Sequence, residues 1–363
     1  MHIPDGYLSP STCAVAYAAA VPFWSVAMGR VKRLLATRLV PLLAVVSAFC
    51  FVVMMFNIPL PGGTTGHAVG MAIASIVLGP WPAILAISVA LFMQAVFFGD
   101  GGITSFGANC LNMAVVGSLA AYWLYRLIAG NAPLESVRRV VAGAIAGYVA
   151  INLAALLAAI EFGIQPLLFH DAAGAPLYAP YPLGVAIPAM LIGHLSFAGL
   201  AEAVITGGII AYLQRANPQL LRLTAPGASQ AEAAPPPAAS GGWRGTRSLW
   251  LGLSLLMILS PLGLLAAGTA WGEWGIEDFQ DEATRQAIAR ASGDVAAPAV
   301  PPQGLARLSS IWTAPIPDYA PGFMQSEAFG YILSAVVGCG LILLAFLLLS
   351  RILARRPQQP ATS

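Results

Sequence analysis

The chain has few charged residues. Asp, Glu, Lys and Arg together make up 9% of its 363 residues, and Lys32 is its one lysine. A soluble domain carries about 25% charged residues, so this composition excludes an ordinary soluble protein. The sequence also lacks a G-x-x-x-x-G-K-[ST] loop and therefore the usual site for ATP hydrolysis. An H-E-x-x-H motif is missing as well, which argues against a zinc hydrolase of that class.

The four cysteines form no C-x-x-C pair and lie mostly in apolar stretches: Cys13, Cys50, Cys110 and Cys339. Their spacing predicts neither a zinc finger nor a disulfide framework. We interpret them as small buried hydrophobic residues. The chain has 17 basic and 15 acidic residues, and its net charge of +2 gives no indication of nucleic-acid binding.

Hydrophobic residues, by contrast, make up 58% of the chain and gather in long runs. A run of about 17–25 apolar residues can cross a bilayer as a helix. We predict nine spans, of which the third is short, at residues 9–29, 38–56, 66–79, 81–98, 106–128, 140–162, 183–213, 249–270 and 329–350. The expected fold is an all-α polytopic membrane helix bundle.

The basic residues predict the orientation of these spans. With the N-terminus outside, 14 of the 17 fall on the inner side, as the positive-inside rule requires: Arg30, Lys32, Arg33, Arg38, Arg126, Arg138, Arg139, Arg215, Arg222, Arg244, Arg247, Arg351, Arg355 and Arg356. No Lys or Arg precedes the first apolar run, so we expect an uncleaved first span with an external N-terminus. The C-terminus is then expected in the cytoplasm.

Composition divides the chain into three parts. Residues 1–222 form a seven-span block with short connections. Residues 223–247 are rich in Ala, Pro, Gly and Ser, which is typical of a flexible cytoplasmic linker. Residues 248–363 hold two spans joined by an external loop, residues 271–328. We therefore predict a seven-span core followed by a two-span accessory hairpin.

The N-terminal Met1-His2 pair offers three nitrogens to one metal ion. They are the α-amine of Met1, the backbone nitrogen of His2 and the nearer imidazole nitrogen of His2. These close a five-membered and a six-membered chelate ring nearly in one plane. Such a set favours square-planar ions such as Ni²⁺ or Cu²⁺. His67, in a Gly-rich segment expected on the same outer side, is the best candidate for the fourth nitrogen.

Residues near these ligands are candidates for supporting roles. The Pro4-Asp5-Gly6 sequence predicts a tight turn that folds the N-terminus back into the bundle. Asp5 would either fix this turn or add negative charge near the ion. Thr64 and Thr65 are expected to hydrogen-bond groups around the metal and so orient the His67 ring.

Four polar residues within predicted spans have two possible roles each. Asn109 and Asn112 share a helix face, and they either line the metal cavity or join helices by hydrogen bonds. Glu202 is a carboxylate within a membrane span, which makes it a functional candidate. His194 lies eight residues earlier in that span. Both also fit a structural, hydrogen-bonded role.

Two of these segments resemble the signature motifs of the CbiM/NikM family. They are Met1-His2-Ile3-Pro4-Asp5-Gly6-Tyr7-Leu8-Ser9-Pro10 and Gly62-Gly63-Thr64-Thr65-Gly66-His67. The segment from His194 to Gly207 is similar to a later family pattern, so the resemblance covers residues 1 to about 215. The tail resembles the family's N-type accessory subunit in Trp271-Gly272-Glu273-Trp274-Gly275 and Pro317-Asp318-Tyr319.

The resemblance implies a substrate-capture (S) subunit of an energy-coupling-factor importer for Ni²⁺ or Co²⁺. Met1, His2 and His67 would bind the ion, which is a transported substrate rather than a permanent cofactor. The implied partners are two ATP-binding subunits and one transmembrane coupling subunit in a prokaryotic inner membrane. Nickel is slightly favoured because the tail departs from the separate cobalt-type accessory subunit.

Two other functions stay open at this point. One is a stand-alone, ion-coupled secondary transporter of divalent metal that uses Glu202 and His194 as a proton relay. The other is an intramembrane metalloenzyme, for which the sequence offers no clear general base near His2 and His67. The expectation is therefore a transporter subunit and not an enzyme.

Overall fold

The computed structural model describes residues 1–35, 40–224 and 247–354. Within them, seven helical segments are long and apolar enough to cross a membrane: Pro10–Lys32, Pro80–Phe98, Phe106–Ala129, Val137–Leu168, Leu183–Ala216, Arg247–Leu265 and Glu327–Ile352. The expected all-α membrane bundle is confirmed. Most of the linker predicted at 223–247 lies outside the described residues.

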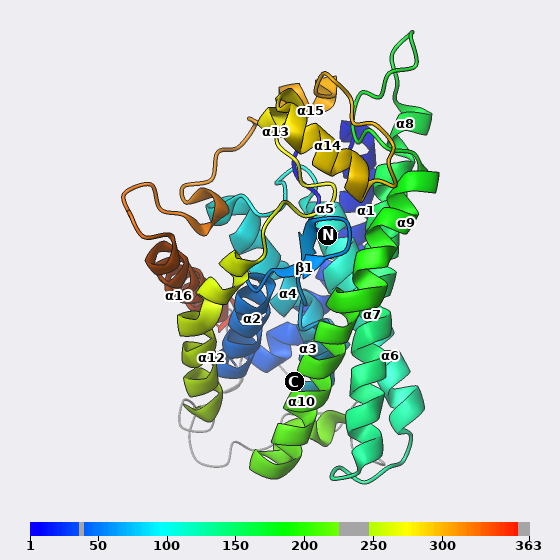
Figure 1. Cartoon of the computed structure of the whole chain (residues 1–363). Helices are drawn as coiled ribbons and strands as arrows, with labels where there is room; N and C mark the ends of the chain where they lie inside the picture. The colour runs from blue at the N-terminus through cyan, green and yellow to red at the C-terminus, as the bar shows by residue number, and fades with distance from the viewer. Residues whose placement is uncertain (36–39, 225–246, 355–363) are drawn as a thin grey trace, which may run out of the picture.

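The capture core, which we define as residues 1–222, is built from helices that run along one common direction (Figure 1). Several are interrupted by short π-helical turns. In chain order they are α1 (Pro10–Leu35), α2 (Val40–Met54), α3 (Met71–Leu78), α4 (Pro80–Met93), η1 (Gln94–Phe98), α5 (Phe106–Asn109), η2 (Cys110–Gly117), α6 (Ser118–Ala129), α7 (Val137–Gly163), α8 (Gln165–Leu168), α9 (Leu183–Gly193), η3 (His194–Ala198), α10 (Gly199–Ala216) and η4 (Pro218–Thr224).

The third predicted span differs from expectation. Its helix α3 has eight residues and is therefore about 12 Å long, too short to cross a hydrocarbon core of about 30 Å by itself. The preceding residues form a hairpin in which β1 (Ile58–Leu60) pairs antiparallel with β2 (Thr64–Gly66). Gly62 and Gly63, with φ of +89° and +79°, make its turn. Its second strand is buried within the bundle.

The C-terminal domain, residues 247–354, packs against the capture core. Its two long helices contact α2, and its outer loop crosses the end of the bundle near the N-terminus (Figure 1). The elements of this domain are α12 (Arg247–Leu259), η5 (Ser260–Leu265), α13 (Ile276–Gln280), α14 (Glu282–Ala291), α15 (Gln303–Leu308), η6 (Pro317–Tyr319) and α16 (Glu327–Ala354).

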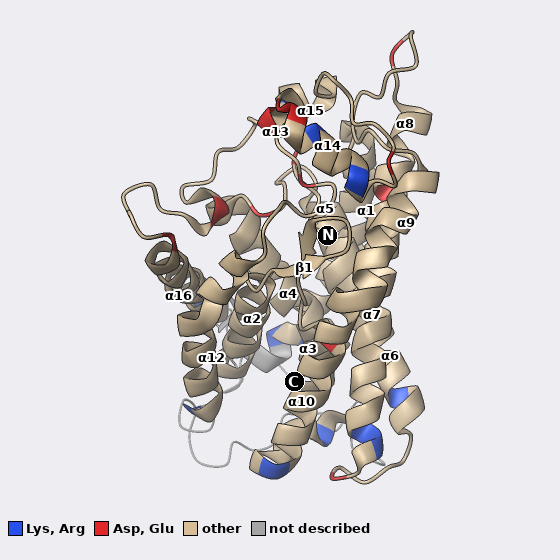
Figure 2. Cartoon of the chain, viewed as in Figure 1, with Lys and Arg blue, Asp and Glu red and all other residues tan. Residues whose placement is uncertain are grey.

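Charges separate along the bundle axis. Figure 2 shows Lys and Arg gathered at one end and most Asp and Glu at the other, where α13 to α15 lie. The exceptions include basic residues of α14 and Glu135, in the loop between α6 and α7. This separation agrees with the distribution of basic residues from which the orientation was predicted. The orientation itself stays a prediction. Four of the basic residues used for it lie outside the described residues: Arg38, Arg244, Arg355 and Arg356.

Close packing between α7 and α10 depends on glycine. A Cβ added at Gly147 of α7 would lie 3.1 Å from Thr206 Oγ1 and 3.2 Å from Glu202 Cγ. We expect Gly147→Leu to destabilise the protein by about 1–3 kcal/mol, because overpacking forces helices apart. Gly208→Leu on α10 is the control, since that position faces open space. Thermal unfolding in detergent should show a lower midpoint for Gly147→Leu alone. Equal midpoints for the two variants would contradict this packing.

Candidate metal centre

The N-terminus is buried inside the bundle. Met1, His2 and Ile3 are 3%, 1% and 0% exposed. The backbone of Ile3 is held from both sides by Asn109, whose Oδ1 accepts from the Ile3 N–H at 2.8 Å and whose Nδ2 donates to the Ile3 carbonyl at 3.1 Å. The backbone N–H of Gly102 donates to the same carbonyl at 2.8 Å. Both backbone polar groups of Ile3 are therefore satisfied, as burial requires.

The turn after Ile3 is fixed by its own side chain and by a close contact. The Asp5 carboxylate accepts from the backbone N–H of Ile103 at 3.1 Å and of Thr104 at 2.7 Å. Gly6 has a φ of +88°, and a Cβ there would lie 2.7 Å from Leu305 Cα. Only glycine fits this position. The Asp5 carboxylate therefore joins this turn to the Ile103–Thr104 segment, and its role toward a metal stays a prediction.

This burial brings the two predicted histidine ligands together. The ring centroids of His2 and His67 are 4.9 Å apart, with an angle of 33° between the planes. Nδ1 of His67 lies 3.0 Å from the Ala68 carbonyl, so it carries the proton and leaves Nε2 able to bind a metal. Nε2 of His2 is buried with no hydrogen-bond partner, which is uncommon for a buried polar atom.

Two carboxylates contact the same terminus. Glu273 Oε1, from the outer loop of the C-terminal domain, lies 3.0 Å from the Met1 amine. Asp100 binds Nδ1 of His2. The other Asp100 oxygen accepts from the Tyr319 hydroxyl at 2.5 Å and from Gln94 Nε2 at 3.1 Å. Two of the nitrogens assigned to the chelate are therefore paired with carboxylates in this structure.

The local charges favour neutral His67 beside ionised Asp100. Burial lowers the pKa of His67 well below its usual value, and the charges of His2 and the terminal amine lower it further. Burial raises the pKa of Asp100, but the adjacent His2 outweighs this and holds it well below its usual range. Neutral imidazole is the form that binds metals.

Glu202 positions the segment that carries His67. Its Oε2 accepts from the backbone N–H groups of Val69 and Gly70, each at 2.8 Å. Gly70 is the N-cap of α3, which begins at Met71, so the carboxylate sits at the positive end of that helix dipole. His194 forms a separate contact, with Nδ1 2.8 Å from the Met190 carbonyl. No hydrogen bond joins His194 to Glu202 in the described part of the chain.

The remaining candidates lie around the site without touching its histidines through a hydrogen bond. The Thr64 hydroxyl donates to the Thr269 carbonyl at 2.9 Å, and Thr65 forms a β-bridge with Ala270. Both threonines thus join the hairpin to the C-terminal domain. Asn112 Nδ2 donates to Glu161 Oε2 at 2.6 Å. The π-helical turn that begins at Cys110 changes the register of this helix, and Asn109 and Asn112 have different partners.

Sequence reasoning missed Asp100, Glu273 and Tyr319 as neighbours of the terminus. Their sequence signals were weak, since Asp100 belongs to no motif and Glu273 and Tyr319 appear only in the motifs by which the tail resembles the accessory subunit. In the described residues, no group of three or more His, Cys, Asp or Glu side chains is arranged to hold a metal ion. A metal bound by His2 and His67 would therefore need donors other than a third such side chain, and the backbone and terminal nitrogens are the nearest ones the sequence offers.

The chain belongs to the CbiM family, because residues 2–220 match the family model described as the cobalt uptake substrate-specific transmembrane region. Residues 246–355 match the PDGLE domain. It is therefore a multi-pass membrane protein of a metal-transport family. The family and the fused accessory domain expected from the motifs are both confirmed.

One relative matches this chain along most of the length of both proteins. The chain is 59% identical over 342 residues to the fused nickel transport protein NikMN of Rhodobacter capsulatus, covering 94% of this chain and 95% of that protein. It is 54% identical to a truncated transition metal transporter solved by crystallography, with a TM-score of 0.55, covering 59% of this chain and 98% of that one. A second crystal structure of a transition metal transporter is 53% identical, also with a TM-score of 0.55, over 59% of this chain and 93% of its own.

The Asn109 contacts predict how firmly the terminus is held. Asn109→Ala leaves the buried N–H of Ile3 without its partner, at a cost of about 1–3 kcal/mol. We expect the Met1 amine to react with an acylating reagent roughly tenfold faster or more in this variant. Lys32 provides an internal reference. Asn112→Ala, three residues further along and bonded elsewhere, should leave the rate unchanged. The same rate in both variants would show that Asn109 does not anchor the terminus.

Proposed function

We propose that this chain is the metal-capture subunit of an ATP-driven energy-coupling-factor importer for Ni²⁺ or Co²⁺. The observation that carries the proposal is the buried terminus, which brings His2 to 4.9 Å from His67 between ring centroids. Nickel is favoured for two reasons. A donor set of nitrogens in one plane suits Ni²⁺, and the Rhodobacter capsulatus relative is described as a nickel transport protein.

The proposed ligands are the Met1 amine, the backbone nitrogen and Nδ1 of His2, and Nε2 of His67. A nitrogen binds a metal through a lone pair, so an ammonium must release one proton, and the His2 backbone amide and any protonated coordinating imidazole nitrogen must release theirs. In this structure the Met1 amine is paired with Glu273 and Nδ1 of His2 with Asp100. Metal binding would replace both contacts. The two carboxylates would then remain close by as negative charge opposite the cation.

The energy for uptake is proposed to come from other chains. This sequence has no phosphate-binding loop, so ATP would be hydrolysed by two partner subunits and coupled through a third, transmembrane subunit. The C-terminal domain reaches the site directly through Glu273 and Tyr319. We infer that this domain governs how the ion enters the site, in addition to supplying two membrane helices.

The stand-alone transporter with a proton relay receives no support from the contacts of its two residues. Glu202 is occupied by backbone N–H groups and His194 by the Met190 carbonyl. Metal uptake by the isolated chain in ATP-depleted vesicles would favour this alternative over the importer subunit.

Extending the chain before Met1 tests the amine directly. A few added residues leave every side chain intact but convert the amine into an amide, which cannot serve as the same ligand. We expect high-affinity Ni²⁺ binding to be lost, as measured by isothermal titration on purified protein. The same residues added after Ser363 are the control and should have no effect. Full binding by the N-terminal extension would contradict the proposed ligand set.

The two histidines should be individually required. Loss of a residue that merely supports a ligand costs about 10–100-fold in metal affinity, so loss of a ligand should cost more than about a hundredfold. We expect this for His2→Ala and for His67→Ala. His170→Ala is the matched control, since His170 is exposed in an outer loop. If only His67→Ala lost affinity, the Met1-His2 chelate would be ruled out.

Removing residues 249–363 should separate capture from transport. The ligands proposed above all lie in the capture core, so the truncated chain should retain more binding than uptake. Labelled-metal uptake in cells that also produce the partner subunits, compared with binding to the purified truncated chain, provides the measurement. Equal losses of binding and uptake would make the accessory assignment wrong.

A further inference from the structure

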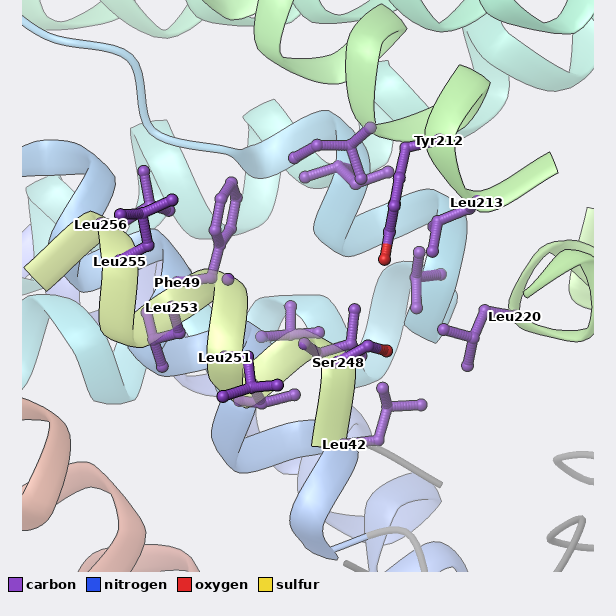
Figure 3. A pocket seen from close by; sticks show the side chains of 17 residues that line it. Leu42, Phe49, Tyr212, Leu213, Leu220, Ser248, Leu251, Leu253, Leu255 and Leu256 are labelled. Atoms are coloured by element: carbon purple, nitrogen blue, oxygen red, sulfur yellow. The ribbon is translucent and has the colours of Figure 1, made fainter. Parts of the chain in front are cut away.

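A large apolar cavity lies between α2, α3, α10 and α12 and includes none of the residues of the candidate metal centre in its lining. Its volume is about 680 Å³, within the range of about 300–1,000 Å³ found for ligand sites. It is lined by α2, α3 and α10 of the capture core, by η4 and by α12 of the C-terminal domain. Figure 3 shows Phe49, Leu213 and Leu251 among the side chains around it. Among the described residues of the lining, Tyr212 and Ser248 supply the only side-chain hydroxyls.

The walls of this cavity belong to helices of the predicted hydrocarbon region. The segments that contain α10 and α12 both meet the length and hydropathy of membrane spans. α12 packs on α2 and α16, whereas α10 packs on α7 and α3, which leaves space between α10 and α12. Leu251 and Leu255 are 62% and 57% exposed. A ligand in this place must be apolar, and a lipid acyl chain is the apolar molecule that surrounds such helices.

Three arginines are close in sequence to lining residues, at the ends of α10 and η4 and at the start of α12. Arg215 is in the last turn of α10 and Arg222 in the last turn of η4, each two residues from a lining leucine, and Arg247 precedes the lining residue Ser248. All three are exposed, and none forms an ion pair with another described residue. Basic pockets between membrane helices are suited to anionic headgroups.

We propose that this cavity holds an acyl chain of an anionic phospholipid, whose phosphate is bound by Arg215, Arg222 and Arg247. The apolar walls select a hydrocarbon chain, and the adjacent arginines select a negative headgroup in the leaflet at the basic end of the bundle. Because α10 and α12 belong to different domains, the lipid would join the capture core to the C-terminal domain. This site is independent of the metal ligands.

Photolabelling of the full-length chain tests both the cavity proposed for the acyl chain and the arginines proposed for the headgroup. The probes are phosphatidylglycerol and phosphatidylcholine with the same diazirine-bearing acyl chain, mixed equally into nanodiscs. We expect labelled peptides from α2, α10 and α12, and a preference of about tenfold for phosphatidylglycerol. Equal labelling by the two lipids, or labels spread evenly over α7 and α16, would show annular lipid only and overturn the proposal.

Variants test separately the arginines proposed to bind the lipid headgroup and the cavity proposed to hold its acyl chain. The triple variant Arg215→Gln, Arg222→Gln, Arg247→Gln should lose the preference for phosphatidylglycerol. The matched triple Arg30→Gln, Lys32→Gln, Arg351→Gln removes the same charge from exposed positions that do not line the cavity, and it should keep the preference.

Leu251→Trp should fill the cavity and reduce its labelling, unlike Leu344→Trp on α16. An unchanged thermal unfolding midpoint shows that each variant is folded. A preference that survives the first triple variant would overturn the proposal.

Discussion

Burial of a charged chain terminus constrains this structure more than any other single feature. An ammonium group is stable in a low-dielectric interior only if a counter-charge accompanies it. Glu273 provides that charge at 3.0 Å, and it comes from the far end of the chain. The Ile3 backbone is meanwhile held by Asn109 and Gly102. The terminus is thus fixed as firmly as an interior segment, which is the condition for its nitrogens to act as ligands.

The two domains are linked through this terminus. Asp100 of the capture core binds His2 and also accepts a hydrogen bond from Tyr319 of the C-terminal domain. Thr64 and Thr65, in the hairpin that precedes His67, contact Thr269 and Ala270 of that domain. Because these contacts are direct, a change at the proposed metal ligands would alter the loop of residues 271–328 immediately. This direct contact gives a physical reason for fusing the PDGLE domain to the capture core.

Much of this architecture could be predicted, because hydropathy and the Met1-His2 motif are local in sequence. The helical class followed from apolar runs, and the adjacency of His2 and His67 followed from their predicted placement on one side. The third span was predicted to be short, but the β-hairpin that takes up its first residues could not be predicted, since a hydropathy window counts apolar residues and does not register strand pairing. Asp100, Glu273 and Tyr319 were missed because their contacts join distant segments, for which no periodicity exists. Asn109 and Asn112 bind different partners because a π-helical turn changes the helix register between them. Residue type does not predict where such a turn occurs.

The most direct test of the central claim is X-ray absorption spectroscopy of the purified, nickel-loaded protein. It reports which atoms surround the ion and in what geometry. If the terminus and His67 bind the metal, the spectrum should show four nitrogen neighbours in a square plane, with scattering from two imidazole rings. A six-coordinate shell dominated by oxygen, or a spectrum with no imidazole scattering, would contradict the account.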